Sequence, residues 1–223
     1  MRRGLVRSMS VPRLMSPALG IALVGALTLS SCSVEGDFAY VNNSQEKTFV
    51  KVPRKWKRFT ITREIAKDRT TPIDIGSGSW HIVFDSATEP DADNVAAEVP
   101  SSLVGEIEIT EVNTTFHEVL NVKISRSHAT DFAFDPVEEW QNGNEDFELI
   151  DYQEITTGTG MRGNRVVFNW RVNGTDWVTI DQTTYLNPAT SKYYRMLIKC
   201  EALCFKENLR LVRQIADSFQ VRA

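Results

Sequence analysis

The chain has 223 residues, of which 42% are hydrophobic and 24% are charged, a balance typical of globular rather than disordered proteins. Its formal net charge is −4, and because the first 31 residues carry four arginines and no acid, the remainder carries a net charge of −8. Such an acidic chain has no basic surface for binding nucleic acid, which excludes that class of partner. Its net charge does not favour binding to an anionic membrane either, so any membrane attachment is expected to be covalent.

The first 31 residues have the three zones of a secretory signal peptide in the usual order. A basic segment over 1–13 precedes an uncharged segment over 14–29, and Ser30 and Ser31 supply small residues before a cut. The uncharged segment contains Pro17 and is short for a helix that spans a bilayer core of about 30 Å. We therefore predict a removed signal peptide over 1–31, with an uncleaved membrane anchor as the alternative.

The segment Leu29-Ser30-Ser31-Cys32 resembles the lipobox of bacterial lipoproteins, in which small residues precede a cysteine at the end of an apolar run. The resemblance implies that Cys32 receives a diacylglyceryl group and becomes the first residue of the mature protein. Two acyl chains give a stable membrane anchor, at about 0.8 kcal/mol per buried CH₂. The polar residues over 32–46 are then expected to form a tether, followed by a single domain over 47–223 on the extracytoplasmic face of the cell membrane.

The first half of this domain contains short runs of alternating apolar and polar residues. Strands are expected at Thr48–Pro53, at Trp80–Asp85 and over 104–110. The acidic segment over 89–100 contains two prolines and is expected to be a loop. Apolar residues at helical spacing predict a helix over 115–126.

The second half predicts an antiparallel meander. Strands are expected over 147–156, 164–172, 177–186 and 193–199, and Asn173-Gly174 is a strong signal for a two-residue hairpin. After Cys204, apolar residues recur at helical spacing and predict a last helix that covers one face of the sheet. The expected fold class is therefore α+β, an antiparallel sheet covered by helices on one face.

Cys200 and Cys204 are the two cysteines that remain when Cys32 is lipidated. Outside the cytoplasm an even pair favours a disulfide, which would fix the corner between a strand and a helix. A metal site would need two or more further ligands, and the three histidines are scattered along the chain. A redox pair is poorly supported because the spacing is C-x-x-x-C and no thioredoxin-like βαβ pattern surrounds it.

The order of elements carries a second resemblance. A strand ends in Val52-Pro53 with Trp56 after it, long antiparallel strands follow, and a helix runs into the segment from Ala216 to Val221. This order resembles the PsbP-like fold, and more closely its actinobacterial lipoprotein branch of the LpqN type, whose members also pair a lipobox with Cys-x-x-x-Cys before the last helix. The resemblance covers about residues 47–222 and implies a small binding adaptor without catalysis.

No catalytic constellation is apparent in the sequence. The glycine-rich segment over 158–163 matches G-x-G-x-x-G, but a strand and not a helix is expected after it, so we interpret it as a hairpin loop. A Ser–His–Asp set could use His81, His117 or His128, although no spacing favours it. The acidic residues over 138–148 lack the calcium-loop pattern and are expected to form a solvated loop.

Aromatic residues are concentrated in the second half of the chain. If some face outward they could bind an amphipathic ligand or an envelope protein, whereas core packing is the alternative. The candidate surface residues are Trp140, Trp177, Tyr185, Tyr193 and Tyr194. The sequence thus predicts a membrane-anchored, non-catalytic binding or interaction module of the cell envelope without a cofactor or metal, with a lipid or glycolipid carrier or sensor and an envelope hydrolase as alternatives.

Overall fold

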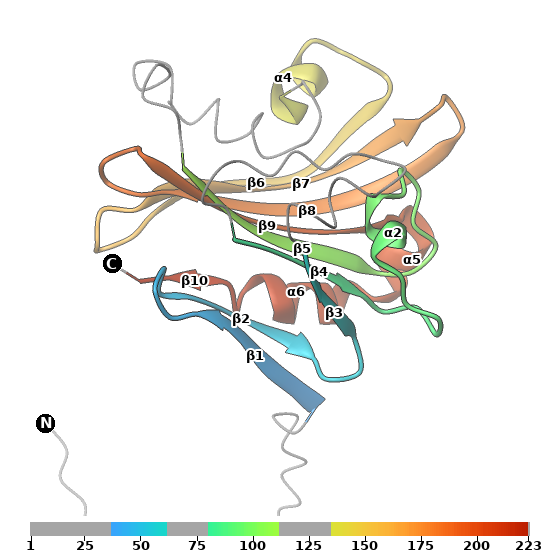
Figure 1. The fold of residues 1–223 in the computed structure, drawn as a ribbon. Coiled ribbons are helices and arrows are strands. Elements are labelled where there is room, and N and C mark those ends of the chain that lie inside the picture. The colour runs from blue at the N-terminus through green and yellow to red at the C-terminus, as the bar shows by residue number, and fades with distance from the viewer. Residues whose placement is uncertain (1–36, 62–79, 112–134, 223) are drawn as a thin grey trace, which may run out of the picture. The chain divides into compact units, whose positions relative to one another are not determined.

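Figure 1 shows the fold of the chain in a computed structural model, which describes residues 37–61, 80–111 and 135–222. All of these residues belong to one compact unit, Val34–Ala223. The predicted leader, Cys32, the predicted helix over 115–126, His117 and His128 lie outside the described residues.

The largest element of the fold is a seven-stranded sheet in the order β3-β4-β5-β9-β8-β7-β6, in which all neighbouring strands are antiparallel. This arrangement confirms the predicted strands and the α+β class. Strands β6 to β9 form the predicted meander, but β5 pairs with β9, so the chain passes from β5 to the far edge of the sheet before β6. The strands are β3 (Lys57–Thr60), β4 (Trp80–Asp85), β5 (Val104–Glu111), β6 (Phe147–Thr156), β7 (Arg162–Val172), β8 (Asp176–Leu186) and β9 (Lys192–Glu201).

Two tight hairpins in the second half follow directly from the turn residues. The hairpin between β7 and β8 lies where Asn173-Gly174 predicted it, but Val172 pairs with Asp176, so the loop over 173–175 is one residue longer than expected. Asn173 and Gly174 have φ angles of 50° and 72°, the left-handed conformation that these residue types favour in turns. The glycine-rich segment over 158–163 begins in the loop over 157–161 that connects β6 to β7 and ends within β7; Gly160, in the loop, has a φ of 82°. The prediction of a hairpin loop in place of a dinucleotide site is confirmed, because β7 and not a helix follows.

A second, three-stranded sheet joins the two ends of the described chain. It has the order β1-β2-β10, with β1 at Phe38–Asn43, β2 at Thr48–Pro53 and β10 at Gln220–Val221. Strand β1 lies within the segment predicted to be a tether, so the folded part begins earlier than residue 47. The tether interpretation missed β1 because only Val41 of this polar strand is buried, whereas its other residues are exposed or partly exposed.

The described helices are short: α2 (Ala92–Ala96), α4 (Pro136–Gln141), α5 (Ala202–Glu207) and α6 (Leu209–Ala216). Helix α2 lies where a loop was expected. Helix α4 lies where a solvated acidic loop was expected, because Asp135 caps it by accepting hydrogen bonds from the backbone N–H groups of Val137 and Glu138. The last helix is interrupted at Asn208. None of the described helices is long and apolar enough to cross a membrane.

Both faces of the large sheet are covered, as Figure 1 shows, with α6 and the small sheet on one side and α4 on the other. We call the side of the large sheet that α5, α6 and the small sheet cover the helix face. The main core lies on this side and includes Ile107, Met196, Ile198, Phe205 and Val212. The opposite face carries two smaller clusters, one under α4 and one under α2. Strand residues alternate between the two cores, which explains the period-2 pattern of the sequence.

Candidate functional site

The five aromatic residues predicted as a binding surface do not lie on one surface. Tyr185 and Tyr194 are opposite each other on β8 and β9 and belong to the main core, where Tyr185 packs 5.6 Å from the ring of Phe219. Trp140 is 47% exposed on α4, on the opposite face. Trp177 is partly buried at the start of β8, with the guanidinium of Arg171 5.3 Å from its ring centre.

The two neighbouring tyrosines of β9 point to different sides of the sheet. Burial, and then the nearby carboxylate of Glu46, raise the pKa of Tyr194 to about 12, and its hydroxyl donates a hydrogen bond to that carboxylate at 3.3 Å. Burial also raises the pKa of Tyr193, on the opposite face, and Glu108 adds to that effect. Both tyrosines therefore stay protonated and take part in the interior of the fold, in agreement with the core-packing alternative.

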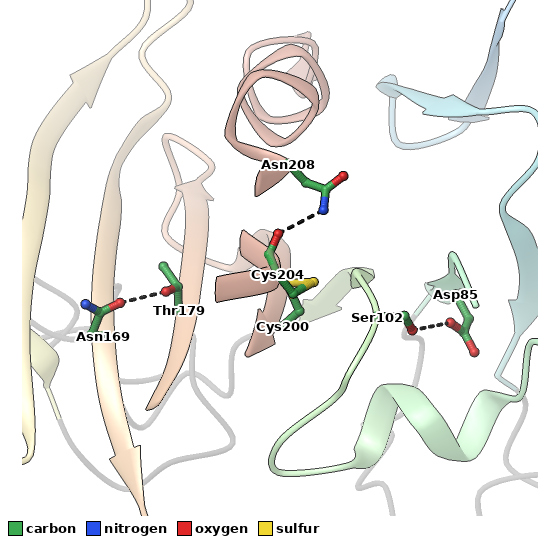
Figure 2. Close-up of a disulfide and its surroundings, with 7 residues drawn as sticks. All are labelled: Asp85, Ser102, Asn169, Thr179, Cys200, Cys204 and Asn208. Atoms are coloured by element: carbon green, nitrogen blue, oxygen red, sulfur yellow. Dashed lines mark hydrogen bonds between the residues drawn. A yellow bond between two sulfur atoms is a disulfide. The ribbon is translucent and has the colours of Figure 1, made fainter. Parts of the chain in front are cut away.

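Cys200 at the end of β9 and Cys204 in α5 lie at disulfide distance, with their Cα atoms 6.0 Å apart (Figure 2). Next to them, the side-chain amide of Asn208 donates a hydrogen bond of 2.8 Å to the carbonyl oxygen of Cys204, at the break between α5 and α6. The predicted position of this pair, at the corner between a strand and a helix, matches the structure. The corner fixes how α5 lies against the sheet.

Helix α5 forms one wall of an open groove on the helix face, with a volume of about 590 Å³. Leu203 of α5 and Leu209 of α6 line it and are 68% and 37% exposed. Strand β6 provides the other wall, where Ile150 is 53% exposed. Three of the five exposed large hydrophobic side chains in the described part of the chain therefore line this one groove, and such clustering makes it the candidate binding surface.

Ile150 reaches the groove because of an irregularity in β6. The pairing of β6 with β7 shifts by one residue between Leu149 and Asp151, so Ile150 has no partner in the register. Such a bulge re-aims side chains and breaks the alternation of a strand. The sequence could not predict it, because the run over 147–156 is compatible with unbroken alternation.

The floor of the groove contains a nearly buried ion pair. Arg165 of β7 binds Asp181 of β8 through two hydrogen bonds of 2.9 and 2.6 Å and binds Asp217 at 2.8 Å. Burial by itself would lower the pKa of Arg165, but the carboxylate of Asp181 outweighs burial and raises it, so the guanidinium stays charged. Further along the floor, the hydroxyl of Thr179 donates to the side-chain oxygen of Asn169 at 2.6 Å (Figure 2).

These groups are bonded to one another and thereby fix the shape of the groove. No histidine or cysteine is found among the groove-lining residues that the structure describes. Within the described ranges there is also no group of three metal-ligating side chains. The rim carries charges of both signs, including Lys206 and Arg213 on the helices and Asp151 on β6, so the groove combines apolar walls with a mixed polar rim.

A second unusual feature lies on the opposite face, where four charged or titratable side chains are buried in the sheet. Arg195 of β9 is 2% exposed and bridges Glu106 and Glu108 of β5, at 2.5 and 2.9 Å. The Nε2 atom of His81 on β4 lies 3.3 Å from Glu106. Burial by itself would raise the pKa of Glu106, but Arg195 and His81 outweigh burial and hold that pKa well below its usual range. His81, one of the three histidines considered for a Ser–His–Asp set, therefore lies beside a glutamate inside the sheet.

No protein-family model matches the sequence, and no curated protein matches it either. Among solved structures, cyanobacterial PsbP (CyanoP) from Synechocystis sp. PCC 6803 is similar over 87% of this chain and 99% of its own, with a TM-score of 0.50 and 15% identity. The Ran-binding protein Mog1p of Saccharomyces cerevisiae aligns over 82% of this chain and 95% of its own, with a TM-score of 0.44 and 10% identity. LpqN of Mycobacterium tuberculosis, described as involved in cell envelope biogenesis, aligns over 83% and 91%, with a TM-score of 0.39 and 12% identity.

At 15% identity, the similarity to CyanoP concerns the fold alone. The antiparallel large sheet and the helices that cover it agree with the fold class expected from the sequence. The assignment to the LpqN-type lipoprotein branch stays a prediction. The chain described here has a PsbP-like fold.

Proposed function

We propose that this protein is a lipid-anchored, non-catalytic interaction module of the cell envelope, and that the groove on the helix face binds an amphipathic segment of a protein partner. The observation that carries the proposal is the set of exposed aliphatic side chains on both walls, Ile150, Leu203 and Leu209. Apolar walls with a charged rim suit a peptide that offers apolar side chains along one stripe. The corner at Cys200 and Cys204 holds α5 in place before binding, which reduces the ordering entropy that binding would cost.

The alternative of a lipid carrier receives less support from the packing. A carrier of this architecture would need room between sheet and helices, whereas buried side chains such as Met196, Phe205 and Ile215 fill that space around the groove. The hydrolase alternative would need a nucleophile beside a base. His81, the histidine that the structure describes, has its Nε2 atom beside Glu106 inside the sheet.

The groove can be tested by placing a photo-crosslinking amino acid at Leu203 in the full-length protein in its own membranes. We expect a discrete protein adduct after irradiation. Leu209→Asp, made in the same chain, should abolish the adduct because it puts a charge into the apolar wall. A crosslinker at Trp140 is the matched control, since it is also exposed but lies on the opposite face.

Equal adducts from Leu203 and Trp140, or an adduct that survives Leu209→Asp, would rule out the groove as the binding site. An adduct with lipid in place of protein would support the carrier alternative. Stoichiometric labelling of the purified protein by a fluorophosphonate would support the hydrolase.

The anchor is tested separately, through the modification of Cys32. Metabolic labelling with a clickable fatty acid should modify the wild-type protein, and Cys32→Ala should lose all label, because the thioether has no other attachment point. A Cys200→Ser/Cys204→Ser variant controls for acylation at the other cysteines and should keep the label. Continued labelling of Cys32→Ala would contradict the anchor and leave the groove proposal unaffected.

A further inference from the structure

The turn between β2 and β3 concentrates positive charge on an otherwise acidic protein. Four of the five residues over 54–58 are basic, namely Arg54, Lys55, Lys57 and Arg58, and all four are exposed. The fifth, Trp56, is 4% exposed and its backbone N–H donates a hydrogen bond of 3.0 Å to the carbonyl oxygen of Pro53. The buried indole ties the turn to the main core, so the basic side chains are presented from a fixed piece of backbone.

The basic turn continues into the outer side of the small sheet. There, Lys51 lies 5.4 Å from the ring centre of Tyr40, and the guanidinium of Arg222 lies 4.9 Å from the ring centre of Phe49. These residues and Arg54 line a shallow groove of about 810 Å³, and Tyr40 is 64% exposed. Arg58 of β3 points to this side of the strand, whereas Lys57 shares the side of Phe59 and faces away. We call this surface the basic–aromatic face; it consists of Tyr40, Phe49, Lys51, Arg54, Lys55, Arg58 and Arg222.

Within the described part of the chain, Asp217 and Asp37 lie beside the five basic side chains of this face and offset its positive charge only in part. Asp217 lines the same groove but is paired with Arg165 at 2.8 Å. Asp37 is exposed at the start of β1, where its carbonyl oxygen accepts a hydrogen bond from the backbone N–H of Arg54. The mature net charge of −8 therefore conceals a local excess of positive charge, and net charge alone does not describe how this protein meets a charged surface.

The basic–aromatic face also lies at the end of the described fold where β1 begins. In Figure 1 the turn from β2 to β3 lies beside the beginning of β1, and Phe38 pairs with Pro53. Asp37 follows Cys32 by five residues, and since an extended chain spans at most about 3.6 Å per residue, the start of β1 lies within about 18 Å of Cys32. A lipidated Cys32 would hold this face within reach of the bilayer surface.

We propose that the basic–aromatic face binds anionic phospholipid headgroups, in addition to the covalent anchor. Lysine and arginine bind the phosphates, and aromatic rings beside them suit the boundary between headgroups and acyl chains. Acidic surface elsewhere is repelled by the same membrane, so the protein lies on the bilayer in one orientation. The inference does not depend on the groove proposal, because no residue of the basic–aromatic face lines the groove on the helix face.

The test uses the compact unit Val34–Ala223, which contains every described strand and helix but no anchor. Its partition onto phosphatidylcholine vesicles is compared, by co-sedimentation, with its partition onto vesicles that also contain phosphatidylglycerol. We expect binding that requires the anionic lipid and weakens with added salt. Neutralising three exposed basic residues of this face with Arg54→Gln, Lys55→Gln and Arg58→Gln should reduce the partition coefficient by about tenfold or more.

The matched control removes three exposed basic residues from α5 and α6, with Lys206→Gln, Arg210→Gln and Arg213→Gln, so both variants have the same net charge. Circular dichroism should show the same folded spectrum for both, and the control should keep partition within about threefold of wild type. The proposal is overturned by equal losses in the two variants, by equal binding to both kinds of vesicle, or by no binding at all.

Discussion

At the scale of single residues, the buried Arg195 is the most demanding feature of the fold. It interacts with two carboxylates inside a sheet, and isolated charges in that position would be strongly destabilising. In the neighbouring strand, the side-chain amide atoms of Gln182 are buried and have no hydrogen-bond partner within the described part of the chain. The opposite face is therefore polar at its centre, and its stability depends on the ionisation of Glu106.

Glu106 makes that dependence measurable as a function of pH. Its pKa in the folded protein lies below the ordinary value of 4.5, so its contribution to stability is present above about pH 4.5 and is lost as the pH falls below that value. We expect the free energy of unfolding, measured with urea, to fall on acidification in the wild type. Glu106→Gln should be less stable at pH 7 by about 3 kcal/mol and should show a shallower acid slope. Parallel slopes for the two proteins would contradict the role of Glu106.

At the scale of elements, the close approach of β7 and β8 depends on Gly163. A Cβ atom at this position would lie 1.9 Å from the carbonyl oxygen of Thr184, inside the contact distance of any two heavy atoms. Gly163 is the last glycine of the glycine-rich segment, and the structure places it in β7 and not in the loop. The absence of a side chain at Gly163 lets the backbones of β7 and β8 approach each other. A comparison with dinucleotide-binding motifs would instead assign this glycine to a phosphate-binding loop.

Gly163→Ala should therefore push β7 away from β8 and destabilise the protein by about 3 kcal/mol or more. Gly158→Ala, in the same segment, is the control, because a Cβ atom there meets nothing within 4 Å. Urea unfolding of the two variants should separate them clearly. Similar midpoints for both would show that the sheet adjusts without cost and that Gly163 has no packing role.

The sequence predicts elements whose burial follows a regular period and misses features that arise from distant neighbours. Strand β6 and the hairpin at Asn173 and Gly174 were predictable, since period-2 alternation and turn chemistry are local properties. The pairing of β5 with β9 was not, because single-strand patterns contain no information about a distant partner. The same limit applies to the groove. Leu203 appears in the sequence as one more apolar helix residue, and its 68% exposure follows only from how α5 is held.

At the scale of the whole molecule, the small sheet connects the beginning of the described chain to its end. Strand β2 pairs with β1 on one edge and with β10 on the other. The buried valines of the small sheet, Val41, Val50 and Val52, complete the main core together with α6. The folded unit is therefore incomplete without the segment that the sequence suggested was a tether.

A chain that begins at residue 47 should be less stable than one that begins at residue 34, because it loses Val41 from the core and exposes an edge of β2. Removal of one buried aliphatic side chain costs about 1–3 kcal/mol, and the unpaired edge should also promote self-association. Urea unfolding and size-exclusion chromatography would measure the two effects. Equal stability and equal elution of both chains would restore residue 47 as the domain boundary.

The long-range closure of β2 has a consequence for synthesis and export. The backbone N–H of Lys51 is hydrogen-bonded to the hydroxyl of Ser218, 167 residues later, and β10 is the last strand of the chain. If the chain crosses a membrane N-terminus first, as a signal peptide would direct, the pairing of β10 with this edge of β2 can form only after residues 220–221 have emerged. Closure of the small sheet would then be one of the last steps of folding.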